Sequence, residues 1–191
     1  MKHLGTTVLE TGRLILRPFT IEDAQPMYDN WASDPEVTKY LTWPPHASVG
    51  VTKDVLAGWI AGYERADCYV WAITVKPDGP PIGSIATTGI SRDDIAMVHI
   101  GYCIGRKWWR QGYTSEALAA LIRFFFEEVG VNRVEARHDP RNPNSGAVMR
   151  KCVMKLEAVK RQADRNNQGV CDCAEYAILA EDYFQNGKRN L

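Results

Sequence analysis

The sequence lacks two features, a long apolar run and an excess of charge of one sign. No apolar stretch approaches the roughly 20 residues that are needed to cross a bilayer. The first residues, Met-Lys-His-Leu-Gly-Thr-Thr, contain no apolar signal-peptide core. The 23 Lys and Arg residues balance the 23 Asp and Glu residues, which argues against a broad cationic surface. We therefore expect a cytoplasmic protein that has neither nucleic acid nor a membrane as its partner.

Cysteine is scarce and poorly spaced for either disulfides or a metal. Five cysteines cannot all pair within one chain, and Cys171 and Cys173 have no second Cys/His pair at zinc spacing. We expect reduced, mostly buried thiols and no metal site. Internal repeats and low-complexity tracts are also missing. The 191 residues, 45% of them apolar and 24% charged, suit a single globular domain over residues 1–191.

The apolar pattern alternates between strand and helix periods. Strand-like segments are predicted at residues 13–18, 69–75, 82–88, 96–104, 133–137, 155–159 and 173–179. Helices are predicted to begin near Thr20 and Ser48 and to span residues 113–129 and 142–151. Pro26 would bend or delay the first helix, Gly130 would end the third, and residues 91–94 would form a polar turn. A meander followed by alternating strands and helices implies a mixed sheet in an α/β or α+β fold.

A basic loop with a glycine precedes the longest predicted helix. Backbone N–H groups at a helix N-terminus, with the helix dipole behind them, suit a phosphate group. Arg106, Lys107 and Arg110 add positive charge, and Gly112 lets a ligand approach the backbone closely. The loop is neither a P-loop nor a G-x-G-x-x-G turn. From these residues alone, a phosphate site and a solvated turn both remain open.

Two short motifs follow one another in this half of the chain. The segment Trp109-Arg110-Gln111-Gly112-Tyr113-Thr114 keeps the central glycine of the pattern Gln/Arg-x-x-Gly-x-Gly/Ala and departs from its first and last positions. The segment Asn142-Pro143-Asn144-Ser145 matches Asn-x-x-Ser and leads into a short helix that ends at Lys151. Together they resemble the GCN5-related N-acetyltransferase (GNAT) superfamily, in its branch of ribosomal-protein N-terminal alanine and serine acetyltransferases. The resemblance covers nearly the whole chain. It implies a GNAT fold with a mixed central sheet of about seven strands, splayed between the fourth and fifth and flanked by helices.

The resemblance also implies an acetyl-CoA site within residues 96–152 and an acceptor site in the helical region at about 19–66. Backbone amides of residues 111–115 would hold the pyrophosphate, and residues 102–104 would pair with the pantetheine arm. Asn142 would bind that arm from the opposite side. The residues assigned to the cosubstrate are Tyr102, Cys103, Ile104, Arg110, Gln111, Gly112, Tyr113, Thr114, Ser115, Asn142 and Ser145.

The reaction that the resemblance implies is direct attack of an amine on a thioester in a ternary complex. This reaction needs a neutral amine, an oxyanion donor and a proton for the leaving thiolate, but no metal and no enzyme nucleophile. His99 would accept a proton near neutral pH, and a satisfied strand histidine is the alternative. Ser145 would donate a proton, because the position of the superfamily's donor tyrosine holds Met149. A helix-capping hydroxyl is the alternative for Ser145.

The acceptor is expected to be a small-molecule amine or a protein N-terminus. Trp31, Trp43 and Trp71 would line its cleft, although core packing is favoured for at least two of them. Asp34 or Glu36 would attract a cationic amine. A homodimer is compatible with the family. The competing hypothesis is a non-catalytic acyl-CoA-binding sensor or assembly protein of the same fold.

One position departs from the pattern of close relatives. Where they commonly read Lys-Cys-Gly-Met, this chain reads Lys151-Cys152-Val153-Met154. The glycine of the relatives marks a turn from helix to strand, which often needs a positive φ. We predict that Val153 strains this turn, or that the turn follows a different path.

Overall fold

The computed structural model describes residues 1–91 and 94–185. Its strands are β1 (Leu9–Glu10), β2 (Leu14–Arg17), β3 (Val70–Val75), β4 (Pro81–Ile90), β5 (Met97–Ile104), β6 (Arg133–His138), β7 (Lys155–Asn166) and β8 (Gly169–Leu179). Its α-helices are α1 (Ala24–Met27), α2 (Pro35–Thr38), α3 (Val49–Gly62), α4 (Tyr113–Phe124), α5 (Pro143–Lys151) and α6 (Ala180–Gln185). The shorter 3₁₀ or π segments are η1 (Ile21–Asp23), η2 (Tyr28–Ala32), η3 (Arg106–Trp108) and η4 (Phe125–Val129). Within the described residues, no helix is both long enough and apolar enough to span a bilayer. The predicted turn at 91–94 includes residues 92–93, which lie outside the described part of the chain.

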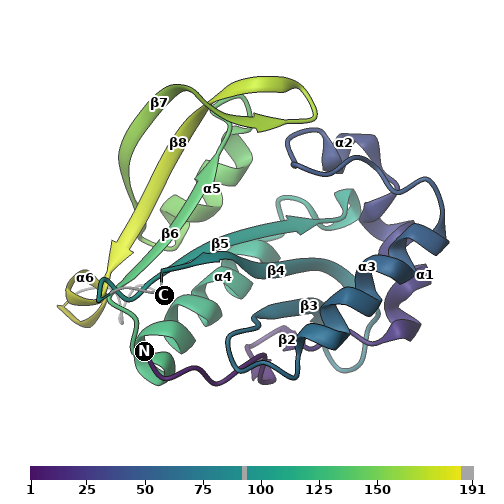
Figure 1. Cartoon of the computed structure of the whole chain (residues 1–191), viewed down its shortest axis with the longest axis horizontal. Helices are drawn as coiled ribbons and strands as arrows, with labels where there is room; N and C mark the ends of the chain where they lie inside the picture. The colour runs from purple at the N-terminus through teal and green to yellow at the C-terminus, as the bar shows by residue number, and fades with distance from the viewer. Residues whose placement is uncertain (92–93, 186–191) are drawn as a thin grey trace.

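The strands form one mixed sheet in the order β1-β2-β3-β4-β5-β6-β8-β7. Neighbouring strands are antiparallel, except that β5 and β6 are parallel. Residues 97–99 of β5 pair with residues 133–135 of β6, and beyond this point the two strands diverge (Figure 1). The GNAT fold is therefore confirmed, with its splay between the strands that were predicted to be the fourth and fifth.

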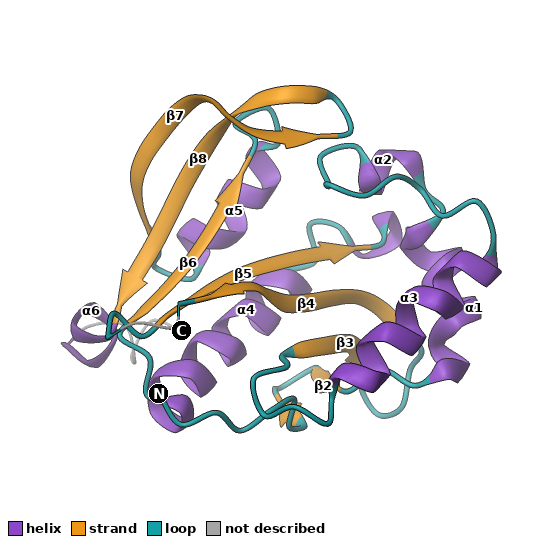
Figure 2. Cartoon of the chain, viewed as in Figure 1, coloured by secondary structure: helices purple, strands orange, loops and turns teal. Residues whose placement is uncertain are grey.

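The sheet has eight strands rather than the predicted seven or so. β1 has two residues, which are too few to show a periodic pattern. The last two strands are longer than predicted and form a curled hairpin, β7 and β8 (Figure 2). Most of β7 is exposed. Its length is therefore set by pairing with β8 and not by an apolar alternation that the sequence could reveal.

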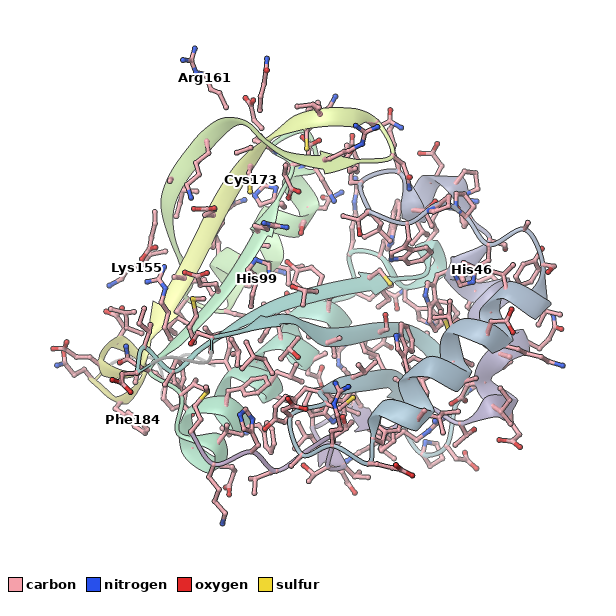
Figure 3. The ribbon with its side chains drawn as sticks, in the orientation of Figure 1. His46, His99, Lys155, Arg161, Cys173 and Phe184 are labelled. Carbon is pink, nitrogen blue, oxygen red and sulfur yellow. The ribbon has the colours of Figure 1, made fainter. Side chains whose placement is uncertain are left out.

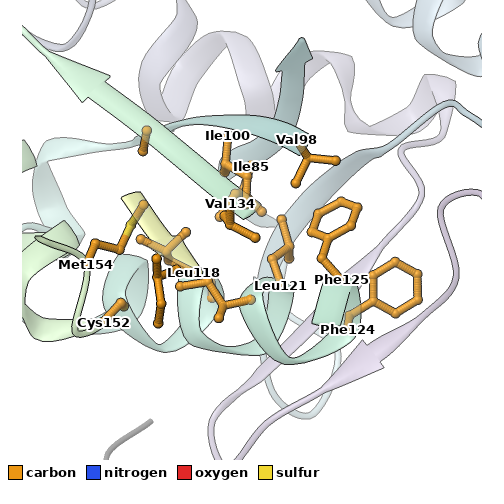
Figure 4. Close-up of a cluster of buried hydrophobic side chains, with 14 of the residues drawn as sticks. Ile85, Val98, Ile100, Leu118, Leu121, Phe124, Phe125, Val134, Cys152 and Met154 are labelled. Carbon is orange, nitrogen blue, oxygen red and sulfur yellow. The ribbon is translucent and has the colours of Figure 1, made fainter. Parts of the chain in front are cut away.

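The main core lies between the sheet and the helices α4 and α5. Leu118 and Leu121 of α4 are fully buried in the same cluster as Val98 and Ile100 of β5 (Figure 4). This is the apolar face that was predicted for the third helix. Gly130 ends that helix with a left-handed φ of +75°, also as predicted. The packing places the N-terminus of α4 near the end of β5.

A second apolar cluster covers the other face of the sheet. Phe19, Trp31 and Leu56 are buried there with Ala72 of β3, so α1, η2 and α3 lie on this face (Figure 1). The first predicted helix is divided into η1, α1 and η2. Pro26 lies inside it and has no N–H to donate, which explains the interruption.

Val153 adopts the left-handed conformation, with φ of +59°. The N–H of Met154 donates to the carbonyl of Met149 at 3.1 Å, and the N–H of Val153 donates to that of Arg150 at 3.1 Å. This pair of hydrogen bonds is a Schellman cap, whose left-handed position is usually taken by glycine. Of the two predicted alternatives, the structure therefore adopts the strained turn.

Candidate active site

A cavity of about 500 Å³ opens where β5 and β6 diverge. Its walls are the end of β5, the loop before α4, the first turns of α5 and the segment around α2. Most of the residues predicted to bind the cosubstrate line it: Tyr102, Cys103, Ile104, Arg110, Gly112, Thr114, Ser115, Asn142 and Ser145. The fold thus brings the two sequence motifs to one place.

The N-terminus of α4 faces this cavity. Gly112 is the N-cap and has a left-handed φ of +82°, which a residue without Cβ takes without strain. The N–H groups of the first helical turn have no acceptor within the helix, and Thr114 and Ser115 of that turn line the cavity. Arg110 also lines it and has a positive φ of +61°. This arrangement suits a phosphate anion.

Gln111 and Tyr113 are not among the residues that line the cavity. The Gln111 side chain donates to the backbone carbonyl of Lys107 at 2.6 Å, and the backbone carbonyl of Gln111 accepts from Arg13 Nη1 at 3.0 Å. The ring of Tyr113 lies 4.4 Å from the guanidinium carbon of Arg13. Both side chains therefore hold the loop in place, which leaves their backbone N–H groups as the atoms available to a ligand.

Arg13 links the first strands to α4. Its Nε donates to Glu116 Oε2 at 2.7 Å. Its backbone N–H and the Thr11 hydroxyl donate to Glu116 Oε1 at 2.9 Å and 2.5 Å. Burial alone would raise the pKa of Glu116, but the hydrogen bonds from Thr11 and Arg13 outweigh burial and lower that pKa. An ionised pair therefore braces the loop from outside the cavity.

The hydroxyl group of Tyr102 meets Ser145 across the cavity wall. The Tyr102 hydroxyl donates to the backbone carbonyl of Ser145 at 2.9 Å, and Ser145 Oγ donates to the Tyr102 hydroxyl at 3.2 Å. The Ser145 hydroxyl therefore points at Tyr102 and does not cap α5. Burial raises the pKa of Tyr102, and the hydrogen bond from Ser145 opposes this shift.

Asn142 precedes α5 as its N-cap residue, and Pro143 follows in the first turn, as predicted. The Asn142 side chain makes no capping hydrogen bond, and the residue lines the cavity. The turn before it is held by the buried carboxylate of Asp139, which accepts from Arg141 at 2.6 Å and from Asn166 at 2.8 Å. The hydrogen bond from Arg141 lowers the pKa of Asp139 well below its ordinary value. This turn therefore presents Asn142 to the cavity.

Cys103 packs against the second apolar cluster, on the face of β5 opposite to Tyr102. Its Sγ lies 3.3 Å from the Ser84 hydroxyl oxygen. Burial raises the pKa of the Cys103 thiol, which keeps it protonated. A protonated thiol is a poor nucleophile, so the environment of Cys103 does not favour an acyl carrier.

His99 lies beside the opening between β5 and β6 (Figure 3). It occupies the same face of β5 as Cys103 but is not among the residues that line the cavity. Its Nδ1 lies 2.6 Å from the Thr88 hydroxyl oxygen. Burial lowers the pKa of His99 and Arg137 adds to this effect, while nearby carboxylates of β6, β7 and β8 oppose it. The imidazole is therefore mainly neutral at pH 7.

The three tryptophans expected at the acceptor cleft do not line the cavity. Trp31 and Trp71 are fully buried, which confirms core packing for these two residues. Trp43 packs against the second apolar cluster. The tryptophans that do line the cavity are Trp108 and Trp109, next to the glycine loop.

The segment around α2 forms the cavity wall on the N-terminal side. Glu36 and Tyr40 line the cavity, whereas Asp34 pairs with Arg106 at 2.5 Å. Of the two acidic residues predicted to attract an amine, Glu36 therefore lies at the cavity, whereas Asp34 forms an ion pair with Arg106.

Several contributors to the cavity were missed from the sequence. Arg141 and Lys151 line it and carry positive charge. Asn167, at the tip of the β7–β8 hairpin, donates to the carbonyls of Thr38 and Trp43 at 2.8 Å and 2.7 Å and so holds the α2 segment. Lys151 had a signal, since it ends the second motif. Asn167 had none, because its partners are more than 120 residues away.

Comparison with known proteins identifies the family. The description "Acetyltransferase (GNAT) domain" matches residues 13–155. The uncharacterized N-acetyltransferase p20 of Bacillus licheniformis is 30% identical over 175 residues, 92% of this chain and 97% of that protein. The ribosomal protein uS5-alanine N-acetyltransferase of Escherichia coli strain K12 is 25% identical over 148 residues, 74% of each chain. The microcin C7 self-immunity acetyltransferase MccE, solved with acetyl-CoA and AMP, has a TM-score of 0.79 at 17% identity, covering 88% of this chain and 93% of its own. Because the family match spans both motifs at the cavity and most of the chain, this protein belongs to the GNAT acetyltransferase family.

Proposed function

We propose that this chain is an acetyl-CoA-dependent N-acetyltransferase that transfers acetyl to a primary amine by direct attack in a ternary complex. The observation that carries the proposal is the cavity that joins the N-terminus of α4 to the splayed end of β5. Its volume of about 500 Å³ falls within the range of about 300–1,000 Å³ that is typical of small-molecule sites. Relatives of the chain are named N-acetyltransferases, which supports the same reaction class.

The residues around the cavity fit the parts of acetyl-CoA. The N–H groups of the first turn of α4, next to Gly112, would bind the pyrophosphate. Residues 102–104 would pair with the amides of the pantetheine arm, because β6 has diverged from this edge of β5. Asn142 would bind the arm from the opposite side, and Arg110 and Lys151 would supply positive charge.

The chemistry needs a proton acceptor, an oxyanion donor and a proton donor. His99, neutral at pH 7, would take the proton of the amine through a water molecule. A backbone N–H of β5 would stabilise the oxyanion at the acetyl carbonyl. The hydroxyl group of Ser145, or that of Tyr102 to which it is hydrogen-bonded, would supply the proton for the leaving thiolate.

The acceptor would approach from the helical region at residues 19–66, where Glu36 lies at the cavity. The carboxylate of Glu36 would attract the protonated, cationic form of the amine, which then loses a proton before it attacks the thioester. One relative is named a ribosomal-protein alanine N-acetyltransferase, so a protein N-terminus is the first acceptor to test and a small-molecule amine the second. In this scheme residues 1–191 act as one domain, with residues 96–152 as the acetyl-CoA core.

Mass spectrometry of reaction products tests the proposal. The protein is incubated with acetyl-CoA and a panel of peptides that begin with Ala or Ser, together with small primary amines. A mass increase of one acetyl group on an amine, with release of free CoA, is the expected result. Binding of acetyl-CoA by calorimetry without any product in the panel would favour the non-catalytic sensor or assembly protein instead.

A further inference from the structure

The position that holds a donor tyrosine in many relatives cannot supply a proton here. It is occupied by Met149, which is buried in the main core with 1% of its surface exposed. Met149 is also not among the residues that line the cavity. A proton for the leaving thiolate therefore comes either from another side chain at the cavity or from water.

Tyr102 of β5 places a phenol group at the cavity, on the wall opposite to α5. It projects from β5, whereas Met149 and Ser145 belong to α5, and both Tyr102 and Ser145 line the cavity. The Tyr102 hydroxyl donates to the Ser145 carbonyl at 2.9 Å and accepts from Ser145 Oγ at 3.2 Å. The two hydroxyl groups are thus coupled where the strand and the helix enclose the cavity.

We propose that the Tyr102 hydroxyl protonates the leaving thiolate and that Ser145 supports it by donating a hydrogen bond to the phenol oxygen. This inference rests on the proposed function, since it names the acid of the same reaction. When the tetrahedral intermediate collapses, the C–S bond breaks and its electron pair goes to sulfur. The Tyr102 O–H proton leaves its hydrogen bond with the Ser145 carbonyl, moves to sulfur and forms the thiol. The phenolate regains a proton from the one released by the amine, so no charge remains on the protein.

Two observations favour Tyr102 over Ser145 as the acid. A phenol, with an ordinary pKa of about 10, is a stronger acid than an aliphatic alcohol. The hydrogen bond runs from Ser145 to Tyr102, so it stabilises negative charge on the phenol oxygen. The reverse arrangement would be needed if Ser145 were to lose its proton. Burial raises the pKa of the phenol, which keeps Tyr102 protonated at neutral pH but makes it a weaker acid than a free phenol. The hydrogen bond from Ser145 lowers this pKa and so favours the transfer.

Substitutions that remove each hydroxyl test the assignment. Tyr102→Phe should lower kcat by about 100-fold, the scale of general acid catalysis, while the Kd for acetyl-CoA changes by less than about threefold. Ser145→Ala should lower kcat less. Tyr176→Phe is the matched control, because Tyr176 is buried, accepts from Arg150 of α5 at 3.0 Å and does not line the cavity. Its kcat should equal that of the wild type.

Replacement of Tyr102 by 3,5-difluorotyrosine separates acid catalysis from packing. Fluorine lowers the phenol pKa and keeps the ring and its hydroxyl. The alkaline fall of kcat should therefore begin at a lower pH than in the wild type, whereas a packing role would leave the profile unmoved. This variant decides the matter if Tyr102→Phe fails to fold.

The outcomes distinguish the inference from the function on which it rests. A wild type that acetylates amines, with an active Tyr102→Phe or an unmoved difluorotyrosine profile, would overturn the role of Tyr102 and leave the function standing. A larger loss in Ser145→Ala than in Tyr102→Phe would return the donor to Ser145. A wild type that binds acetyl-CoA and acetylates nothing would overturn both.

Discussion

At the scale of single residues, Val153 shows that the Schellman cap at the end of α5 forms without the glycine that usually takes its left-handed position. The Schellman bonds at the end of α5 require a left-handed residue, and a β-branched side chain takes that conformation at a cost of about 1–3 kcal/mol. Val153→Gly removes this strain but adds about 0.5–1 kcal/mol of unfolded-state entropy. We expect a small net stabilisation, seen as a melting temperature about 2–4 °C higher.

Val170 of β8 provides the control for this substitution. It is also an exposed valine, but it lies in a strand, so Val170→Gly should lower the melting temperature. If Val153→Gly lowered it as well, the side chain of Val153 would contribute more by packing than it costs in strain.

His99 carries the second prediction at this scale. Burial lowers its pKa, so it becomes an available base below the ordinary histidine pKa of about 6.5. We expect kcat/KM to rise with pH through that lowered pKa in the wild type and His99→Gln to abolish this acidic limb. His46→Gln is the matched control, because His46 also contacts a threonine hydroxyl and also has a pKa lowered by burial. A limb that survives in His99→Gln would assign His99 to a structural role with Thr88.

At the scale of elements, one glycine precedes α4 and another follows its π-helical extension, and both have a left-handed backbone conformation. Gly112 has φ of +82° and lines the cavity, and an added Cβ there would lie 3.4 Å from Arg13 Nη2. Gly130 has φ of +75°, and an added Cβ there would meet nothing within 4 Å. Gly112→Asp and Gly130→Asp therefore impose similar backbone strain. Only the first places a carboxylate beside the proposed pyrophosphate site, so its Kd for acetyl-CoA should rise by about 100-fold or more. Calorimetry that showed equal affinities in the two variants would remove this loop from the cosubstrate site.

The ion pair between the strand edge and α4 belongs to the same scale. Arg13 holds both Glu116 and the carbonyl of Gln111, so Arg13→Met should loosen the loop. We expect KM for acetyl-CoA to rise by about 3–10-fold with kcat unchanged, which matches an exposed pair worth about 1 kcal/mol. Arg65→Met, which breaks the exposed pair with Asp67, is the control and should leave KM unchanged. Equal effects of the two substitutions would show that the Arg13 contact does not position the loop.

At the scale of the whole molecule, histidines make stability depend on pH. The pKa values of His46, His99 and His138 are all lowered by burial in the folded state. Between each lowered pKa and about 6.5 the unfolded chain binds more protons, so stability increases with pH through this window. The melting temperature should therefore fall as the pH is lowered from 7.5 to 5.5. A melting temperature that did not change with pH would show that these histidines have the same pKa in the folded and unfolded states. The paired Asp139 does not affect this test, because it changes stability only at far lower pH.

The helix boundaries that were predicted correctly depend on short segments. Gly112 at the start of α4, Gly130 after its π-helical extension and Asn142 before α5 are recognisable because the residue types preferred at helix ends are set by a few neighbouring positions, although the Asn142 side chain makes no capping hydrogen bond. The tryptophans show the opposite case. Nothing local distinguishes Trp71, which is buried in the core, from Trp109, which lines the cavity.

The sequence by itself determined the strands and helices of the core, the loop before α4 and the family, because periodicity and motifs are local properties of the chain. Only the tertiary structure decided the length of the β7–β8 hairpin. It also decided the hydrogen bonds from Asn167 to the α2 segment and those between Tyr102 and Ser145. Tyr102 and Ser145 are 43 positions apart. Their contact depends on how far β5 and α5 converge after the sheet splays, and that distance is set by packing of the whole core rather than by either segment.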